Sequence, residues 1–196
     1  MTNRRQFLKA SIATSALATS LPVDAATLFA GSSSKALADF IYDDRFLLGV
    51  QMAQNMVQRS TRTHAISGDV AEIWYNHLVP DLANGPRTIG GLTTLGGLFV
   101  MARLGHDAGL TLAMRGSHHI KSDGRTISHA MMAPEHSQRR FSTALNDGVS
   151  WTLALQTELF ALASRPVTDR FELPDMRSHD LAGQTTLHSW LLAPRP

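Results

Sequence analysis

The segment RTIGGLTTLGGLFVMARLGHDAGLTLAMRG, residues 87–116, holds two short apolar runs separated by an amphipathic stretch. The runs at residues 87–92 and 110–116 have the length and composition of strands. Between them, apolar residues recur at helical spacing over residues 95–108, and Gly109 follows as a helix stop. One side of this helix is formed by Leu95, Leu98, Phe99 and Ala102. The segment therefore predicts a strand, a crossover helix and a second parallel strand.

The chain before this segment predicts two more strands and two more helices. Residues 40–42 and 62–67 read as short strands. Apolar residues at helical spacing predict a helix over residues 46–58. A second helix is predicted to begin at Val70 and to end at Pro80. Strands and helices thus alternate up to the quoted segment, which is the order expected for a parallel sheet.

The chain after this segment changes the pattern. RTISHAMM, residues 125–132, follows a Ser-Asp-Gly turn and predicts an antiparallel hairpin partner for the preceding strand. Helices are predicted over residues 137–146 and 149–163, and a late strand over residues 184–192. We therefore expect an α/β fold, with a mainly parallel sheet, crossover helices and an added β-hairpin, as a single domain at residues 39–196.

The N-terminus differs in composition from the rest of the chain. It opens with MTNRRQFLKA, and a weakly apolar Ala/Ser/Thr-rich stretch continues to Leu21. The small residues that end at Ala25 suit cleavage by a signal peptidase. This arrangement resembles the twin-arginine signal peptides of bacteria. The residues that carry the resemblance are Arg4, Arg5, Phe7, Leu8 and Lys9.

The resemblance implies how the protein travels and where it goes. Twin-arginine signals direct proteins that have already folded through the Tat translocase to the periplasm, and such passengers usually carry a cofactor or accompany a partner that does. We expect a signal peptide at residues 1–25 and a linker at residues 26–38. The apolar stretch of the signal is too short to cross a bilayer as a mature helix, so no transmembrane span is expected after its removal. Cleavage of the signal and its retention as an anchor both stay open.

Charge and cysteine content exclude several classes of protein. Residues 1–25 hold three of the 18 basic and one of the 16 acidic side chains, so the remainder carries 15 of each and has a formal net charge of 0. A neutral domain has no field to attract nucleic acid, so no nucleic-acid partner is expected. Cysteine is absent. This excludes Cys-ligated metals, iron–sulfur clusters and covalently attached c-type haem.

Polar residues follow each of the first four predicted strands. Ligands of open parallel sheets bind beyond the carboxyl ends of the strands, where such residues converge. We therefore expect one polar edge that binds a ligand. The candidate residues are Asp43 and Asp44 after the first strand, Asp69 after the second, Thr93 and Thr94 after the third, and His118 and His119 after the fourth.

Structural roles are the competing interpretation of these residues. Asp43, Asp44 and Asp69 stand where helix N-caps favour aspartate. The GLTTLGG segment at residues 91–97 could receive an anion at a helix N-terminus, but it matches no phosphate-binding motif. Its glycines are interpreted as positions of close packing between strand and helix. These glycines, with the one that precedes them, are Gly90, Gly91, Gly96 and Gly97.

Histidines cluster in GSHHIKSDGRTISHAMMAPEH, residues 116–136. Imidazole and carboxylate suit Zn, Mn, Fe or Cu, and His119, His129 and His136 form a candidate metal site. On a hairpin, His119 and His129 could lie on neighbouring strands, whereas His118 and His119 point to opposite faces. No established metal-binding spacing is present. Exposed, hydrogen-bonding histidines are the competing interpretation.

These observations leave three functions open. The first is an accessory or small subunit, or an interaction partner, of a larger periplasmic enzyme; the redox character of that enzyme is implied by the signal alone. The second is a small metal- or anion-binding enzyme, hydrolase-like, with its site at the strand ends. The third is a periplasmic small-molecule binder that uses the same edge. No G-x-S-x-G motif supports a serine hydrolase.

Overall fold

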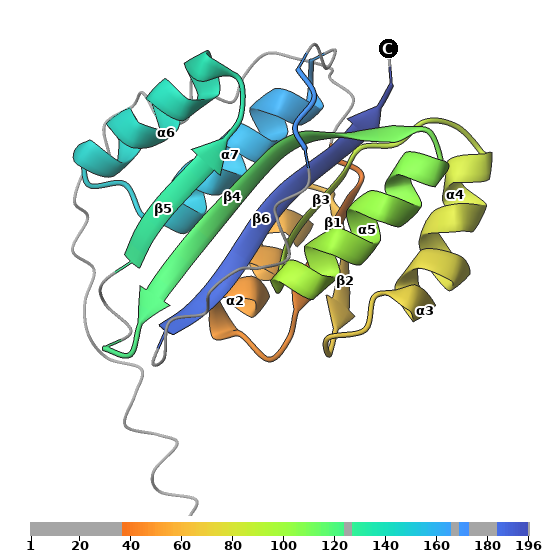
Figure 1. The fold of residues 1–196 in the computed structure, drawn as a ribbon, viewed down its shortest axis with the longest axis horizontal. Coiled ribbons are helices and arrows are strands. Elements are labelled where there is room, and N and C mark those ends of the chain that lie inside the picture. The colour runs from red at the N-terminus through yellow and green to blue at the C-terminus, as the bar shows by residue number, and fades with distance from the viewer. Residues whose placement is uncertain (1–36, 124–126, 166–168, 173–183, 196) are drawn as a thin grey trace, which may run out of the picture. The chain divides into compact units, whose positions relative to one another are not determined.

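The computed structural model describes residues 37–123, 127–165, 169–172 and 184–195. The predicted signal peptide and all but the last two residues of the predicted linker lie outside these ranges. The strands are β1 (Asp39–Asp43), β2 (Arg62–Ile66), β3 (Ile89–Thr93), β4 (Leu110–Lys121), β5 (Ile127–Met132) and β6 (Gln184–Pro194). They form one six-stranded sheet in the order β2-β1-β3-β6-β4-β5 (Figure 1).

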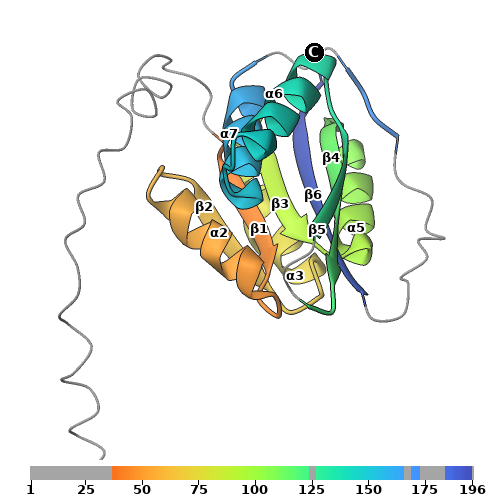
Figure 2. The same ribbon diagram turned by 90° about the vertical axis from the view of Figure 1, so that its left-hand side faces the viewer.

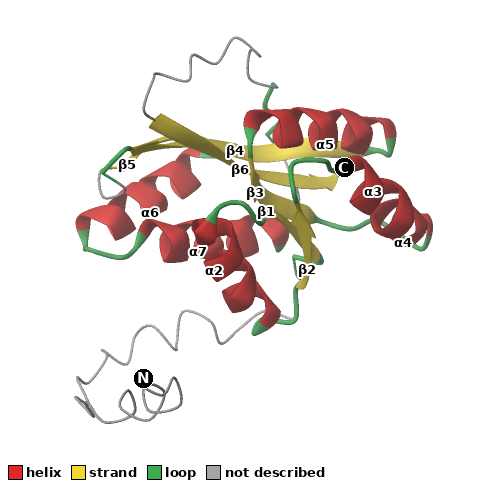
Figure 3. Cartoon of the chain, turned by 90° about the horizontal axis from the view of Figure 1, so that it is seen from below, coloured by secondary structure: helices red, strands yellow, loops and turns green. Residues whose placement is uncertain are grey.

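Helices cover both faces of the sheet, which confirms the α/β class. They are α2 (Leu47–Val57), α3 (Ala71–Ile73), the π-helix η2 (Trp74–Leu78), α4 (Val79–Ala83), α5 (Leu95–Asp107), α6 (Glu135–Asn146) and α7 (Trp151–Ala163). The segments α3 to α5 lie on one face, and α2, α6 and α7 lie on the other (Figure 3). Each face has its own cluster of buried apolar side chains.

The prediction of a mainly parallel sheet was wrong. Strand β1 pairs in parallel with β2 and β3, but β6 lies between β3 and β4 and is antiparallel to both. Strand β5 is also antiparallel to its neighbour β4. The reason lies in β6, which buries apolar side chains on both faces and so suits a central position. These side chains are Leu187, Trp190, Leu191, Leu192 and Ala193.

Trp190 joins β6 to β3 on the face covered by α5. Its side chain is fully buried, and its Nε1–H donates to the hydroxyl of Thr93 at 3.0 Å. Gly91 is the residue paired with Trp190 across the strands, and the indole ring lies over it. A Cβ at residue 91 would lie 2.2 Å from Trp190 Cζ2. Close packing at this glycine is therefore against a neighbouring strand and not against a helix.

We expect Gly91→Ala to destabilise the protein by about 3 kcal/mol, because the added methyl overlaps a ring that the core holds in place. The backbone oxygen of Ile41, 2.9 Å from the same position, blocks relief in another direction. Urea unfolding measures the effect. Gly96→Ala is the matched control. A Cβ at residue 96 would meet no atom closer than 4.0 Å, and this residue lies in helix α5, where alanine is favoured over glycine. Equal stability of the two variants would contradict the packing argument.

The predicted end of the second helix at Pro80 was also wrong. The chain passes from α3 through the π-helical turn η2 into α4, which continues to Ala83. Pro80 lies in the first turn of α4, directly after a π-helical turn in which the N–H of Val79 bonds the carbonyl of Trp74. The wider π-helical turn accommodates the proline ring and its missing N–H, so the helix continues past the proline. It also places His77 on the surface beside β2.

Candidate functional site

The predicted polar edge exists as a row of residues across the sheet. Asp43 ends β1, and Thr93 ends β3. Thr93 pairs with His188 of β6, which in turn pairs with Ser117 of β4. Strand β4 continues past this row to Lys121, so only β1, β2 and β3 end at the edge. Sequence reasoning missed His188, because the position of β6 in the sheet was not foreseen.

Asp43 is bound by a neighbour from its own turn. Its side chain is fully buried, and both carboxylate oxygens accept from Arg45, from Nε at 2.8 Å and from Nη2 at 2.5 Å. Gly68, with φ at +101°, lies under the same guanidinium, and a Cβ there would lie 3.0 Å from Arg45 Nη2. The bidentate pair neutralises the one buried carboxylate of this edge. Asp43 therefore joins the turns after β1 and β2.

The other predicted edge residues also bind nearby protein groups. Ser67 Oγ donates to Asp44 at 3.0 Å, and the N–H of Ala71 donates to Asp69 at 2.8 Å. Asp69 accepts from the first residue of α3, but the N-cap of that helix is Val70. The N-cap of α2 is Phe46. None of the three aspartates therefore occupies a helix N-cap. The hydroxyl of Thr94 accepts from the N–H of Gly97 at the beginning of α5. The Thr93 hydroxyl accepts from Trp190. The polar edge is therefore built largely from internal bonds.

His118 is a fully buried imidazole on the face covered by α6 and α7. Its Nε2 lies 2.8 Å from Ser189 Oγ, and its Nδ1 lies 2.8 Å from Nδ1 of His129, the residue paired with it on β5. The Trp151 ring lies beside the His118 ring, with their centroids 4.6 Å apart and their planes tilted by 33°. Burial, and to a smaller extent the charges of neighbouring histidines, lower the pKa of His118 to about 3. His118 is therefore a neutral member of the core.

The three histidines of the candidate metal site lie apart. His119 points to the other face of the sheet, where its Nδ1 lies 3.0 Å from the hydroxyl of Thr186. His129 contacts His118, and His136 lies on α6, 3.5 Å from an Arg165 nitrogen. Within the described ranges, no group of three or more His, Asp or Glu side chains is placed to hold a metal ion.

An ion-pair network that the sequence analysis did not single out lies at the opposite end of β1. Asp39 is fully buried, and its Oδ1 accepts from Arg62 at 2.7 Å and lies 2.9 Å from His64 Nε2. Its Oδ2 accepts from Arg87 Nε at 3.2 Å, and Arg62 also binds Asp81. Burial raises the pKa of Asp39, but hydrogen bonds from His64 and Arg62 and the charges of both arginines outweigh it and lower that pKa.

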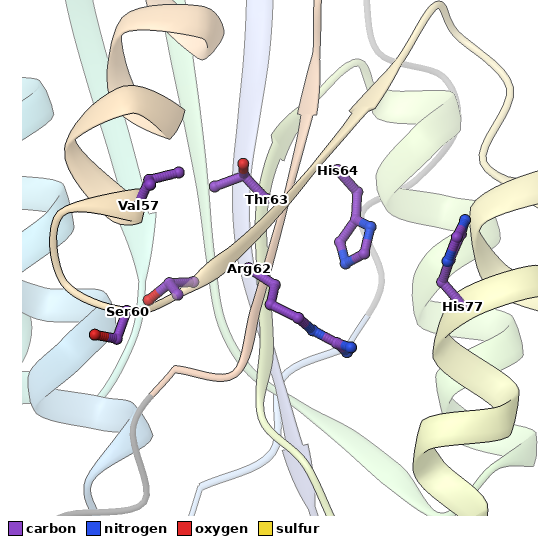
Figure 4. Close-up of a pocket in the computed structure, with 7 residues that line it drawn as sticks. Val57, Ser60, Arg62, Thr63, His64 and His77 are labelled. Carbon is purple, nitrogen blue, oxygen red and sulfur yellow. The ribbon is translucent and has the colours of Figure 1, made fainter.

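A groove lies beside this network along the edge strand β2 (Figure 4). Val57, Ser60 and Thr63 lie on its α2 side, and Arg62, His64 and His77 lie on the side of the π-helical turn. The groove is open, has a volume of about 590 Å³, and is lined by Val57, Ser60, Thr61, Arg62, Thr63, His64 and His77. The rings of His64 and His77 face each other, with their centroids 5.6 Å apart. The sequence signal for this groove was weak, since its residues come from a strand, a turn and an irregular helix.

Comparison with known proteins adds no family to this description. The chain matches no protein-family model, no curated protein and no solved structure. Among the described residues, no helix combines the length and apolar character needed to cross a membrane.

Proposed function

We propose that the chain is exported to the periplasm through the Tat translocase and acts there as an accessory subunit of a larger enzyme. The internal bonding of the polar edge supports a binding role over an enzymatic one. Asp43, Asp69 and Thr93 are held by Arg45, a backbone N–H and Trp190, so they stabilise turns and strands. The redox character of the larger enzyme rests on the twin-arginine resemblance alone.

The observation that carries this proposal is the composition of the edge strand β5. In the part of the chain that the structure describes, only β4 pairs with β5, so one side of its backbone is free to pair (Figure 2). Proteins usually protect such an edge with charged residues or proline. Strand β5 reads ISHAMM and has neither, whereas β2, at the other edge, begins with Arg62.

The side chains of β5 fit the same role. Ser128, Ala130 and Met132 alternate along the strand and are exposed, and Met132 has 42% of its surface exposed. The two small side chains and the flexible thioether leave room on the face of the sheet for the side chains of an added strand. A partner strand that pairs with β5 would extend the sheet through backbone hydrogen bonds. We therefore place the contact with the larger subunit on β5.

Affinity purification of the tagged chain from the periplasm of the native host, followed by mass spectrometry, tests the proposal. We expect one larger protein to accompany the wild-type chain in constant ratio. Ala130→Lys and Met132→Lys each add a charge at the pairing edge, and we expect the double variant to lose at least nine-tenths of that protein.

Leu153→Lys is the control, because Leu153 is an exposed apolar residue of α7 and its replacement makes the same kind of change away from β5. This variant should keep the partner. A wild-type chain recovered as a clean monomer would contradict the accessory role. Recovery of the chain from the cytosol alone would contradict the export.

A further inference from the structure

The groove beside β2 has the lining of an anion site. Its polar side chains are one guanidinium, two imidazoles and the hydroxyls of Ser60, Thr61 and Thr63, and no carboxylate belongs to the lining. Asp39 binds the backs of Arg62 and His64 and is fully buried. The guanidinium and the two imidazoles thus border the groove. The buried carboxylate of Asp39 lies behind them, and the partly exposed carboxylate of Asp81 also binds Arg62.

Asp39 leaves one polar atom on each of these two side chains for the groove. Arg62 binds Asp39 through Nε and Nη2 and binds Asp81 through Nη2, and its Nη1 bonds no other described residue. His64 uses Nε2 on Asp39, and its ring is turned toward His77 (Figure 4). The carboxylate fixes the ring and holds the proton on Nε2, so Nδ1 accepts hydrogen bonds in the neutral ring and donates one toward the groove only when the imidazole is protonated.

Thr61 supplies an independent observation. Only 3% of this residue is exposed, yet its Oγ1 forms no hydrogen bond with any described group. A buried hydroxyl without a partner loses its bond to water and gains none in return, so an unused hydroxyl is unusual in a core. Thr61 belongs to the wall of the groove. A ligand oxygen in the groove would give the hydroxyl the partner it lacks after a rotation of its side chain.

We propose that this groove binds a small oxyanion, the phosphate or carboxylate group of a ligand, between Arg62, His64 and His77, with Thr61 in its wall. The guanidinium, and the imidazoles in their protonated form, donate short, charge-assisted bonds to such oxygens, so binding is expected to strengthen as the pH is lowered. A metal cation fits less well, because the half-exposed Arg62 guanidinium repels it and only two imidazoles face the groove. The proposal is independent of the contact on β5.

Isothermal titration of the full chain with inorganic phosphate, and separately with acetate, tests the proposal. We expect saturable binding of at least one of them, and the stronger one identifies the group that the groove recognises. His77→Glu places a carboxylate on the rim, and we expect binding at least tenfold weaker. Thr61→Val removes the unbonded hydroxyl while keeping the shape of the side chain, so affinity should fall while thermal stability holds or rises.

His106→Glu is the control, because His106 is an exposed histidine of α5 and its replacement makes the same charge change far along the chain from the groove. This variant should bind like the wild type. Two results would overturn the proposal: no saturable binding of either anion, or equal binding by the wild type, His77→Glu and Thr61→Val, which would indicate an adventitious ion only. An affinity loss in His106→Glu as large as in His77→Glu would overturn it as well.

Discussion

Lowering the pH from 7 to 4.5 is expected to reduce the free energy of unfolding by about 2.5 kcal/mol through His118 alone. The unfolded chain takes up a proton on this residue near pH 6.5, whereas the folded chain, in which burial lowers the pKa of His118, does so only near pH 3. Between these values the unfolded state binds more protons, so stability is full above pH 6.5 and falls as the pH falls.

The size of the effect follows from how completely the imidazole is enclosed. His118 is fully buried between Trp151, His129 and Ser189, and none of these supplies a negative charge. A Cβ at Gly116 would lie 2.6 Å from Ser189 Oγ, so this glycine leaves room for the bond between Ser189 and His118. Burial also lowers the pKa of His129, which acts in the same direction.

His118→Gln tests this prediction when urea unfolding is measured from pH 8 to pH 4. The variant should be less stable at pH 8 by about 1–3 kcal/mol, because an amide replaces a well-packed ring that bonds two partners. The difference from the wild type should then shrink by about 1.4 kcal/mol per pH unit below pH 6. Parallel profiles for His118→Gln and the wild type would contradict the burial of a neutral imidazole.

The sequence predicted local elements of this fold more accurately than it predicted the pairing of distant strands. Apolar spacing predicted the helix over residues 95–108 closely, and α5 covers Leu95–Asp107, because helix periodicity and the stop at Gly109 are properties of neighbouring residues. The place of β6 between β3 and β4 depends on contacts some 70 residues apart, such as Ser117 with His188. No local pattern encodes such a contact, so the sheet was wrongly predicted as mainly parallel.

The candidate site divides in the same way. Polar residues are expected at strand ends, and this rule correctly placed Asp43 and Thr93 on one edge. It did not predict that Arg45 would bind Asp43 or that Trp190 would donate a hydrogen bond to Thr93. The alternation of side chains along a strand placed His118 and His119 on opposite faces. Register then made His118, and not His119, the partner of His129. Register is set by the packing of both faces, and a single sequence does not display it.

Asp39→Asn is expected to destabilise the protein by about 3 kcal/mol at pH 7, because it leaves two guanidiniums and an imidazole without their shared counter-charge. In the wild type, Oδ1 serves Arg62 and His64 while Oδ2 serves Arg87. Asparagine keeps one of these oxygens and replaces the other with an NH₂ group, which is a donor and would face an N–H of an arginine or of His64. Urea unfolding measures the loss. The fixed position of His64 depends on the same carboxylate, so the variant should also weaken any anion bound in the groove.

Asp81→Asn is the matched control, since it removes the same charge from the same Arg62 at a site with a quarter of its side chain exposed. About 1 kcal/mol or less is expected there. The pH dependence separates this network from His118. The lowered pKa of Asp39 means that its contribution is complete above about pH 4, the unfolded value, and is lost only as the pH falls further. The gap between the wild type and Asp39→Asn should therefore not shrink between pH 8 and pH 5, because any protonation of His64 adds to the value of the carboxylate. The gap for His118→Gln shrinks over the same range. Equal losses in Asp39→Asn and Asp81→Asn would show that burial of Asp39 adds nothing to the ion pair.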